Sequence, residues 1–158
     1  MRWSTVIRSG LISGSYASVA STAALAVAAR AEGKGAWQPI NATSHWRNGD
    51  AAAGYRDVDL RHTAIGYATN HAACIFWALC FETWRSRRRA AGPMPMLGEA
   101  ALMAVIAAAV DYGPTPRRFT PGWELVLSKK GMAVAYAGLA LGLAAGASRT
   151  QTRRGHCH

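Results

Sequence analysis

The stretch SGLISGSYASVASTAALAVAA, residues 9–29, carries no charge over 21 positions and indicates the fold class of this chain. Residues 62–81, HTAIGYATNHAACIFWALCF, and residues 131–148, GMAVAYAGLALGLAAGAS, are also uncharged. About 20 apolar residues at ~1.5 Å each cross the ~30 Å hydrocarbon core of a bilayer. The three stretches therefore predict three transmembrane helices.

A fourth candidate span, residues 94–112, contains two acidic residues, Glu99 and Asp111. We expect these carboxylates at the two bilayer interfaces, where they pair with loop arginines and leave the span intact. Carboxylates that face inward would instead belong to an ion or proton path. The candidate partners at the interfaces are Arg88, Arg89, Arg117 and Arg118.

Together these stretches predict an all-α integral membrane bundle of four transmembrane helices in a single domain. Thr120 and Pro121 are typical of a helix start, so the last helix of the chain, which contains residues 131–148, is expected to begin soon after them. The predicted helices cover about residues 9–29, 62–84, 94–112 and 123–148, with a long interfacial loop over residues 30–61.

The distribution of charge excludes two soluble classes of protein. The 158 residues carry a net charge of +10, but only 16% of them are charged and 51% are hydrophobic. A nucleic-acid-binding protein gathers basic residues on one soluble face, whereas here they lie at the ends of uncharged stretches. A soluble four-helix bundle carries charges along the outer face of every helix. We therefore expect the lipid bilayer as a partner and no nucleic acid.

The basic residues determine the orientation only weakly. If both termini are cytoplasmic, nine lysines and arginines lie inside and nine lie outside, so the count is balanced. The dense cluster at residues 85–89 occupies a short loop, and such clusters favour the cytoplasmic side. We expect a multi-pass protein whose N- and C-termini are both cytoplasmic.

Small residues recur at four-residue spacing in the first and last uncharged stretches. Lipid offers no hydrophobic force between helices, so close backbone approach through small residues must hold them together. These rows of small residues predict a tight bundle and allow association with a second copy or another membrane protein. The glycines expected at helix contacts are Gly10, Gly14, Gly138, Gly142 and Gly146.

One face of the predicted helix 62–84 is polar through the middle of the membrane and must point into the bundle. A histidine at this depth, His71, is the strongest functional candidate, as a proton relay, substrate contact, or haem or metal ligand. The alternative is that it only hydrogen-bonds neighbouring helices. The residues of this face are Thr63, Tyr67, Asn70, His71, Cys74 and Glu82.

A second group of polar residues lies where the long loop enters this helix. Imidazole and carboxylate ligands suit a divalent metal, although this spacing matches no established signature. The alternative is a solvated cluster in which Arg56 and Arg61 neutralise the acids. No cofactor is predicted, and haem and a divalent metal stay open. The candidate ligands are His45, Asp57, Asp59 and His62.

Four segments resemble a family of short bacterial inner-membrane proteins. They are PINATSHW at residues 39–46, RHTAIGY at 61–67, FWA at 76–78 and TPRRFTPGWE at 115–124. The resemblance implies four membrane helices and a bacterial inner (cytoplasmic) membrane. It implies no activity, cofactor or substrate, because none is assigned to the family.

Three functions fit these observations. The first is a non-enzymatic accessory, scaffold or assembly subunit. The second is a small transporter or a proton- or ion-conducting protein that uses the polar face around His71. The third is a membrane-bound metal-dependent enzyme built on the histidines and aspartates at the loop entrance.

Overall fold

The computed structural model describes residues 3–88 and 95–155, with side chains up to residue 151. Within these ranges the chain forms helices and turns and no strand, which confirms the all-α prediction. Three long helices, α1 (Trp3–Ala31), α4 (Leu60–Arg88) and α6 (Lys129–Gly155), make up most of the fold. Each is long and apolar enough to cross a membrane, with mean hydropathy of 1.4, 1.2 and 1.5 in that order.

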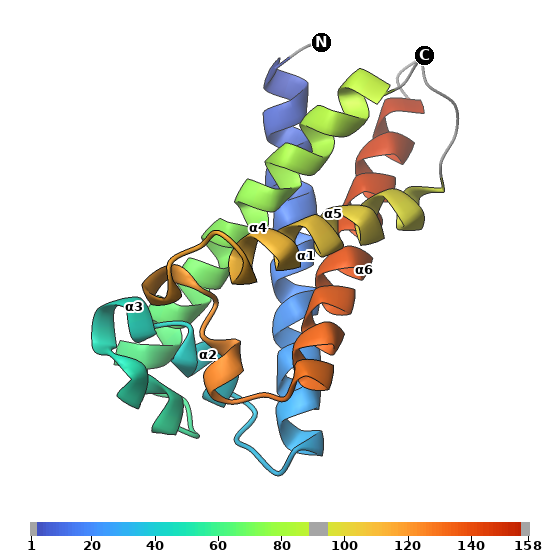
Figure 1. The fold of residues 1–158 in the computed structure, drawn as a ribbon. Coiled ribbons are helices and arrows are strands. Elements are labelled where there is room, and N and C mark those ends of the chain that lie inside the picture. Colours follow the sequence, from blue (N-terminus) through green and yellow to red (C-terminus); the bar gives the residue numbers. More distant parts are fainter. Residues whose placement is uncertain (1–2, 89–94, 156–158) are drawn as a thin grey trace.

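Helix α1 is the central element of the bundle. It packs along α4 and along α6, whereas α4 and α6 make few contacts with each other. It also runs antiparallel to both, so its N-terminal end lies beside the C-terminal ends of α4 and α6 (Figure 1). The two outer helices therefore diverge on either side of α1 and leave a space between them.

The fourth predicted span corresponds to α5 (Met96–Tyr112), which crosses the three long helices at a steep angle (Figure 1). Its 17 residues extend for about 25 Å, less than the ~30 Å of a hydrocarbon core. The structure therefore shows three candidate spans and does not confirm the fourth. Residue 94, where that predicted span begins, lies outside the described residues.

The last long helix begins later than predicted, because a turn precedes it. After Gly122, whose φ of +78° breaks the helical path, η3 (Trp123–Leu125) forms one short 3-10 turn. Glu32, at the end of α1, then accepts hydrogen bonds from the Ser128 amide at 2.9 Å and the Ser128 hydroxyl at 2.6 Å. These bonds lower the pKa of the Glu32 carboxyl and place a negative charge at the start of α6.

The segment between α1 and α4 is folded and not an open loop. It contains α2 (Gln38–Ala42), α3 (His45–Asn48) and the 3-10 helix η1 (Asp50–Gly54). Residues 39–45 are all buried. A Cβ added to Gly66 of α4 would overlap the carbonyl oxygen of Ile40, so α2 lies directly on the backbone of α4.

Glycines of α6 bring its backbone against α1. Gly138, Gly142 and Gly146 all face α1, where the sequence predicts a helix contact. A Cβ added to Gly142 would lie 2.6 Å from the carbonyl oxygen of Tyr16 and 2.7 Å from the amide nitrogen of Ala17. These neighbours are backbone atoms and cannot rotate away, so only glycine fits there.

Glycines of α1 itself make the contact with α4. A Cβ added to Gly14 would lie 2.7 Å from the Cα of Ile75, and one added to Gly10 would meet the side chain of Leu79. Helix α1 therefore approaches α4 through its own glycines and α6 through the glycines of α6. The two contacts hold the three long helices in one fixed arrangement.

The substitution Gly142→Ala tests this packing. We expect a loss of stability of about 1–3 kcal/mol, because steric overlap with α1 outweighs the ~1 kcal/mol gained in helix propensity. The melting temperature of the detergent-solubilised protein measures it. Ala145→Leu, on the exposed face of the same helix, is the matched control and should leave the melting temperature nearly unchanged. An unchanged or higher melting temperature for Gly142→Ala would contradict the close contact.

Candidate functional site

A cavity of about 200 Å³ lies in the space between α4 and α6, near the mid-height of α4. Helix α1 contributes to its wall, and the end of α5 and the segment that follows α5 line it as well. Its lining residues Ala73, Trp46 and Phe119 are themselves exposed, so the cavity opens to the outside of the bundle beside them. The cavity is a consequence of the divergence of α4 and α6.

The polar groups of the cavity come from four elements. Asp111, at the end of α5, accepts a hydrogen bond from the Tyr136 hydroxyl of α6 at 2.7 Å. Asn70 of α4 donates to the hydroxyl of Ser21 on α1 at 3.4 Å. The thiol of Cys74 lies 3.7 Å from the same hydroxyl. The cavity wall therefore presents a carboxylate, an amide, a phenol, a hydroxyl and a thiol.

Three tryptophans line the cavity. The indole N–H of Trp46 donates to Thr69 at 3.2 Å, and the indole N–H of Trp123 donates to Thr43 at 3.1 Å. Trp77 lines the cavity from α4. Because hydrogen bonds hold two of the three indoles, the aromatic wall keeps a defined shape.

The ionisable groups of the cavity wall are acidic. Among the described lining residues, Asp111 is the only charged side chain, and no lysine, arginine or histidine lines the wall. Glu124 lies near the same end of α5, where it accepts a hydrogen bond from Tyr112 at 3.2 Å. When ionised, both carboxylates add to a negative potential at this point of the bundle.

Among the described residues, Asp111 does not have the partner that the sequence predicted. We expected it to pair with an arginine of the adjacent loop, but its partner is the hydroxyl of Tyr136. Helix α5 ends beside the middle of α4, where Asp111 and Cys74 line the same cavity. The oblique path of α5 therefore carries its last turn into the bundle.

Glu99, at the other end of α5, pairs with an arginine that was not among the predicted partners. Its carboxylate pairs with Arg85 of α4 at 3.0 Å. Arg85 also pairs with the buried Glu82 at 3.3 Å, and Glu82 accepts a hydrogen bond from Ser13 of α1 at 3.0 Å. This network joins three helices at the end of the bundle opposite α2. Arg89, another expected partner, lies outside the described residues.

The six predicted polar residues of α4 separate into different environments. Asn70 and Cys74 line the cavity, and Glu82 belongs to the ion-pair network with Arg85. Thr63 donates to the amide oxygen of Asn41 at 2.6 Å and so holds α2. The structure brings only two of the six together at one possible binding site.

His71 and Tyr67, the other two, lie apart from the cavity. Their rings stack with centroids 6.0 Å apart, and Tyr67 is exposed. The Nδ1 atom of His71 is buried and has no hydrogen-bond partner among the described residues. The sequence indicated His71 as the strongest functional candidate of this face, but its neighbour Asn70 is the residue that lines the cavity.

The predicted metal ligands do not form one group. Asp59 bonds to the Nδ1 atom of His62, whose ring stacks on Tyr55. His45 contacts Asp50 at 3.4 Å and the Thr120 carbonyl oxygen at 3.0 Å instead. In residues 3–88 and 95–151, no three His, Cys, Asp or Glu side chains are close enough to hold a metal ion. The chain turns between these residues and separates the imidazoles.

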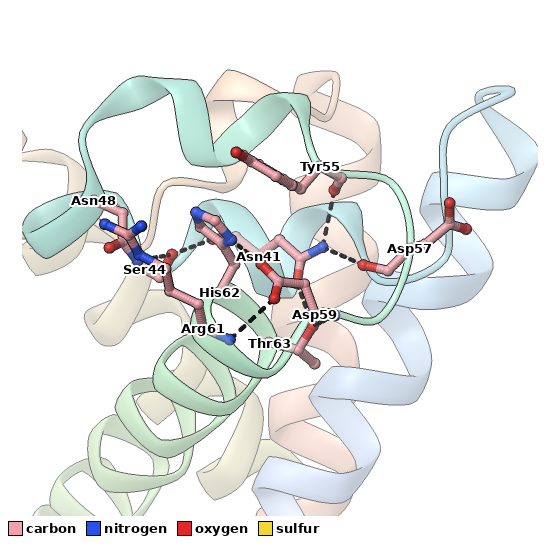
Figure 2. Close-up of polar contacts among 9 residues, drawn as sticks. All are labelled: Asn41, Ser44, Asn48, Tyr55, Asp57, Asp59, Arg61, His62 and Thr63. Atoms are coloured by element: carbon pink, nitrogen blue, oxygen red, sulfur yellow. Dashed lines mark hydrogen bonds and ion pairs between the residues drawn. The ribbon is translucent and has the colours of Figure 1, made fainter.

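Asn41 organises this part of the structure. Its amide nitrogen donates to the carbonyl oxygens of Tyr55 and Asp57, each at 2.9 Å, and its oxygen accepts from Thr63 (Figure 2). Asp57 takes part through its backbone, and its carboxylate points away from His62 (Figure 2). The network fixes the connection between η1 and α4, so the role that it indicates for these residues is structural.

The sequence did not place four of the cavity residues at a site: Ser21, Trp46, Trp123 and Tyr136. It placed Asp111 at one only in the alternative in which the carboxylates of residues 94–112 face inward. Trp46 and Trp123 fall in the segments at residues 39–46 and 115–124, whose unusual mixture of aromatic and polar residues is a detectable signal. Ser21 and Tyr136 carry no local signal, because only the packing of α1 and α6 turns them toward the cavity.

Comparison of the chain with known protein families, curated proteins and solved structures found no match. The family resemblance of the four quoted segments stays a prediction.

The substitution Asn41→Asp tests the role of Asn41. An acidic oxygen would face two carbonyl oxygens, so the variant should lose about 2 kcal/mol or more of stability. Hydrogen exchange of residues 50–59 should also become faster. Asn48→Asp is the control, because Asn48 makes one bond to a hydroxyl that can reverse its direction. Slow exchange in Asn41→Asp would show that other contacts hold this connection.

The pair of Asp59 and His62 predicts a pH effect. The hydrogen bonds from His62 and from the Arg61 amide lower the pKa of the Asp59 carboxyl below its ordinary value of 3.8. A lowered pKa means that this stabilisation is present above pH 3.8 and is lost as the pH falls through the lowered pKa. Asp59→Asn should melt below the wild type at pH 7, and the two should converge in strong acid. A constant difference would show that the carboxylate charge is not involved.

Proposed function

We propose that the protein is a small multi-pass membrane protein that binds a small molecule in the cavity between α4 and α6, with a role in its transport or sensing. The observation that carries this proposal is the cavity itself, a space within the bundle with polar groups from α1, α4, α5 and α6. Polar side chains at this depth are unfavourable unless they have a function or a partner.

The composition of the wall supports a ligand site. Binding sites for small molecules are mostly apolar and aromatic, with a few polar groups that orient the ligand. Three tryptophans beside Asp111 and Asn70 match this description. At about 200 Å³ the cavity is smaller than the ~300–1,000 Å³ of typical drug-sized sites, so it suits a compact ligand.

The third membrane crossing is part of the proposal. Helices α4 and α6 run in the same direction, so the chain must return from one end of the bundle to the other between them (Figure 1). We assign this return to α5 together with residues 113–128. Non-helical backbone is tolerated at membrane depth where it lines a cavity, and part of this segment does so.

The proposed location is a bacterial inner membrane with both termini cytoplasmic. The start of α1 and the ends of α4 and α6 share one end of the bundle (Figure 1). That end carries the dense basic group Arg85, Arg87 and Arg88, and basic clusters near short loops favour the cytoplasm.

A second candidate is the accessory or scaffold role. The observation that favours it is the fixed packing of the bundle, because Gly14 and Gly142 leave no space between α1 and its neighbours. A rigid bundle with exposed apolar helices suits a subunit of a larger complex. A second polypeptide that co-purifies in equal amount from the native membrane would support this role.

The substitution Ala73→Leu tests ligand binding. Ala73 lines the cavity and is exposed, so a larger side chain there fills part of the space with little cost to packing. Native mass spectrometry of protein extracted gently from its membrane should show a bound small molecule, reduced about tenfold or more in the variant. Ala72→Leu, one position away and outside the cavity, should retain it. Equal occupancy in wild type and Ala73→Leu would contradict binding in this cavity.

A further inference from the structure

We propose that the cavity between α4 and α6 selects a compact organic cation, such as a quaternary ammonium compound. This inference rests on the proposed ligand-binding function and specifies the ligand class. It follows from three properties of the wall: the carboxyl group of Asp111, the aromatic rings that line the same cavity, and the absence of basic side chains among the described lining residues.

Asp111 is the carboxyl group that would face a bound cation. Its one side-chain hydrogen bond among the described residues comes from the neutral hydroxyl of Tyr136, and no ion pair joins it to a lysine, arginine or histidine. Asp111 is half-buried, and a carboxylate in such a place gains from a positive charge beside it. Glu124 places a second carboxyl group near the same end of α5, where it accepts a hydrogen bond from Tyr112. A bound cation supplies the missing partner.

The other acidic residues in the bundle show a contrast. Glu82 and Glu99 share Arg85, which neutralises much of their charge within the protein. Asp111 lies on the same helix as Glu99, but no arginine of the described residues pairs with it. In this part of the chain, Arg85 therefore balances the carboxylates where α4 and α5 meet, and Asp111 has the Tyr136 hydroxyl instead of a cationic partner.

The aromatic wall indicates the kind of cation. Trp46, Trp77 and Trp123 line the same space as Asp111. Indole faces attract organic cations through their negative quadrupole, and tryptophan is the strongest of the aromatic side chains in this respect. A small metal ion would need several oxygen ligands in place of indoles. An alkylammonium group matches both the aromatic rings and the single carboxylate.

The volume of the cavity limits the size of the cation. An apolar cavity of about 150 Å³ holds benzene, so about 200 Å³ accepts a group such as choline or another short quaternary amine. Larger lipophilic cations would need part of the molecule to extend through the opening near Phe119.

Two probes of the same shape test the charge preference. Choline and 3,3-dimethylbutan-1-ol differ only in a positive nitrogen in place of a neutral carbon. Isothermal titration calorimetry of the full chain in detergent should give at least about tenfold tighter binding of choline. The variant Asp111→Asn should remove this preference, while the asparagine oxygen can still accept the Tyr136 hydrogen bond.

The control is Asp57→Asn, which makes the same change at an exposed carboxylate outside the cavity. It should bind both probes as the wild type does. Equal binding of the two probes by the wild type, or a choline preference that survives in Asp111→Asn, would overturn the cation assignment and leave ligand binding intact. Binding of neither probe would also overturn it. The proposed ligand binding has its own test. It is contradicted if Ala73→Leu, extracted from the membrane, carries the same small molecule at the same occupancy as the wild type.

Discussion

The backbone contact between α1 and its two neighbours is the constraint on which the rest of the structure depends. Gly142 of α6 and Gly14 of α1 allow helix backbones to approach within the distance of a side chain. In a bilayer such close packing replaces the hydrophobic effect as the source of helix association. Because both glycine contacts involve α1, the outer helices α4 and α6 are fixed relative to α1 and not relative to each other.

The cavity is the direct result of this geometry. Helices α4 and α6 diverge, and the space between them is covered by shorter segments: α5, η3 and the buried run at residues 39–45. Each of these segments brings polar side chains inside the protein, and most of them find partners there. Asn41 holds three oxygen atoms of neighbouring segments, and Arg85 holds two carboxylates. Asp111 differs, because among the described residues its side-chain partner is the neutral hydroxyl of Tyr136.

The burial of polar groups explains why one helix face has two different roles. Along α4, Thr63 and Glu82 bond to other parts of the chain and hold the ends of the bundle together. Between them, Asn70 and Cys74 lie where the neighbouring helices separate, and they line the cavity. A polar stripe in an apolar helix therefore stabilises the fold where the packing is close and lines a cavity where the packing opens.

The sequence by itself determined the three long apolar helices and the glycines through which they touch, because hydropathy and four-residue spacing are local properties of a helix. It also marked Asn70 and Cys74 as inward-facing. Only the tertiary structure decided that α5 runs obliquely, that Asp111 lies at the cavity and bonds to Tyr136, and that His71 lies apart from the cavity. It also decided that His45 and His62 are separated. These outcomes depend on how distant segments fill the space between α4 and α6, and no local pattern encodes the shape of that space.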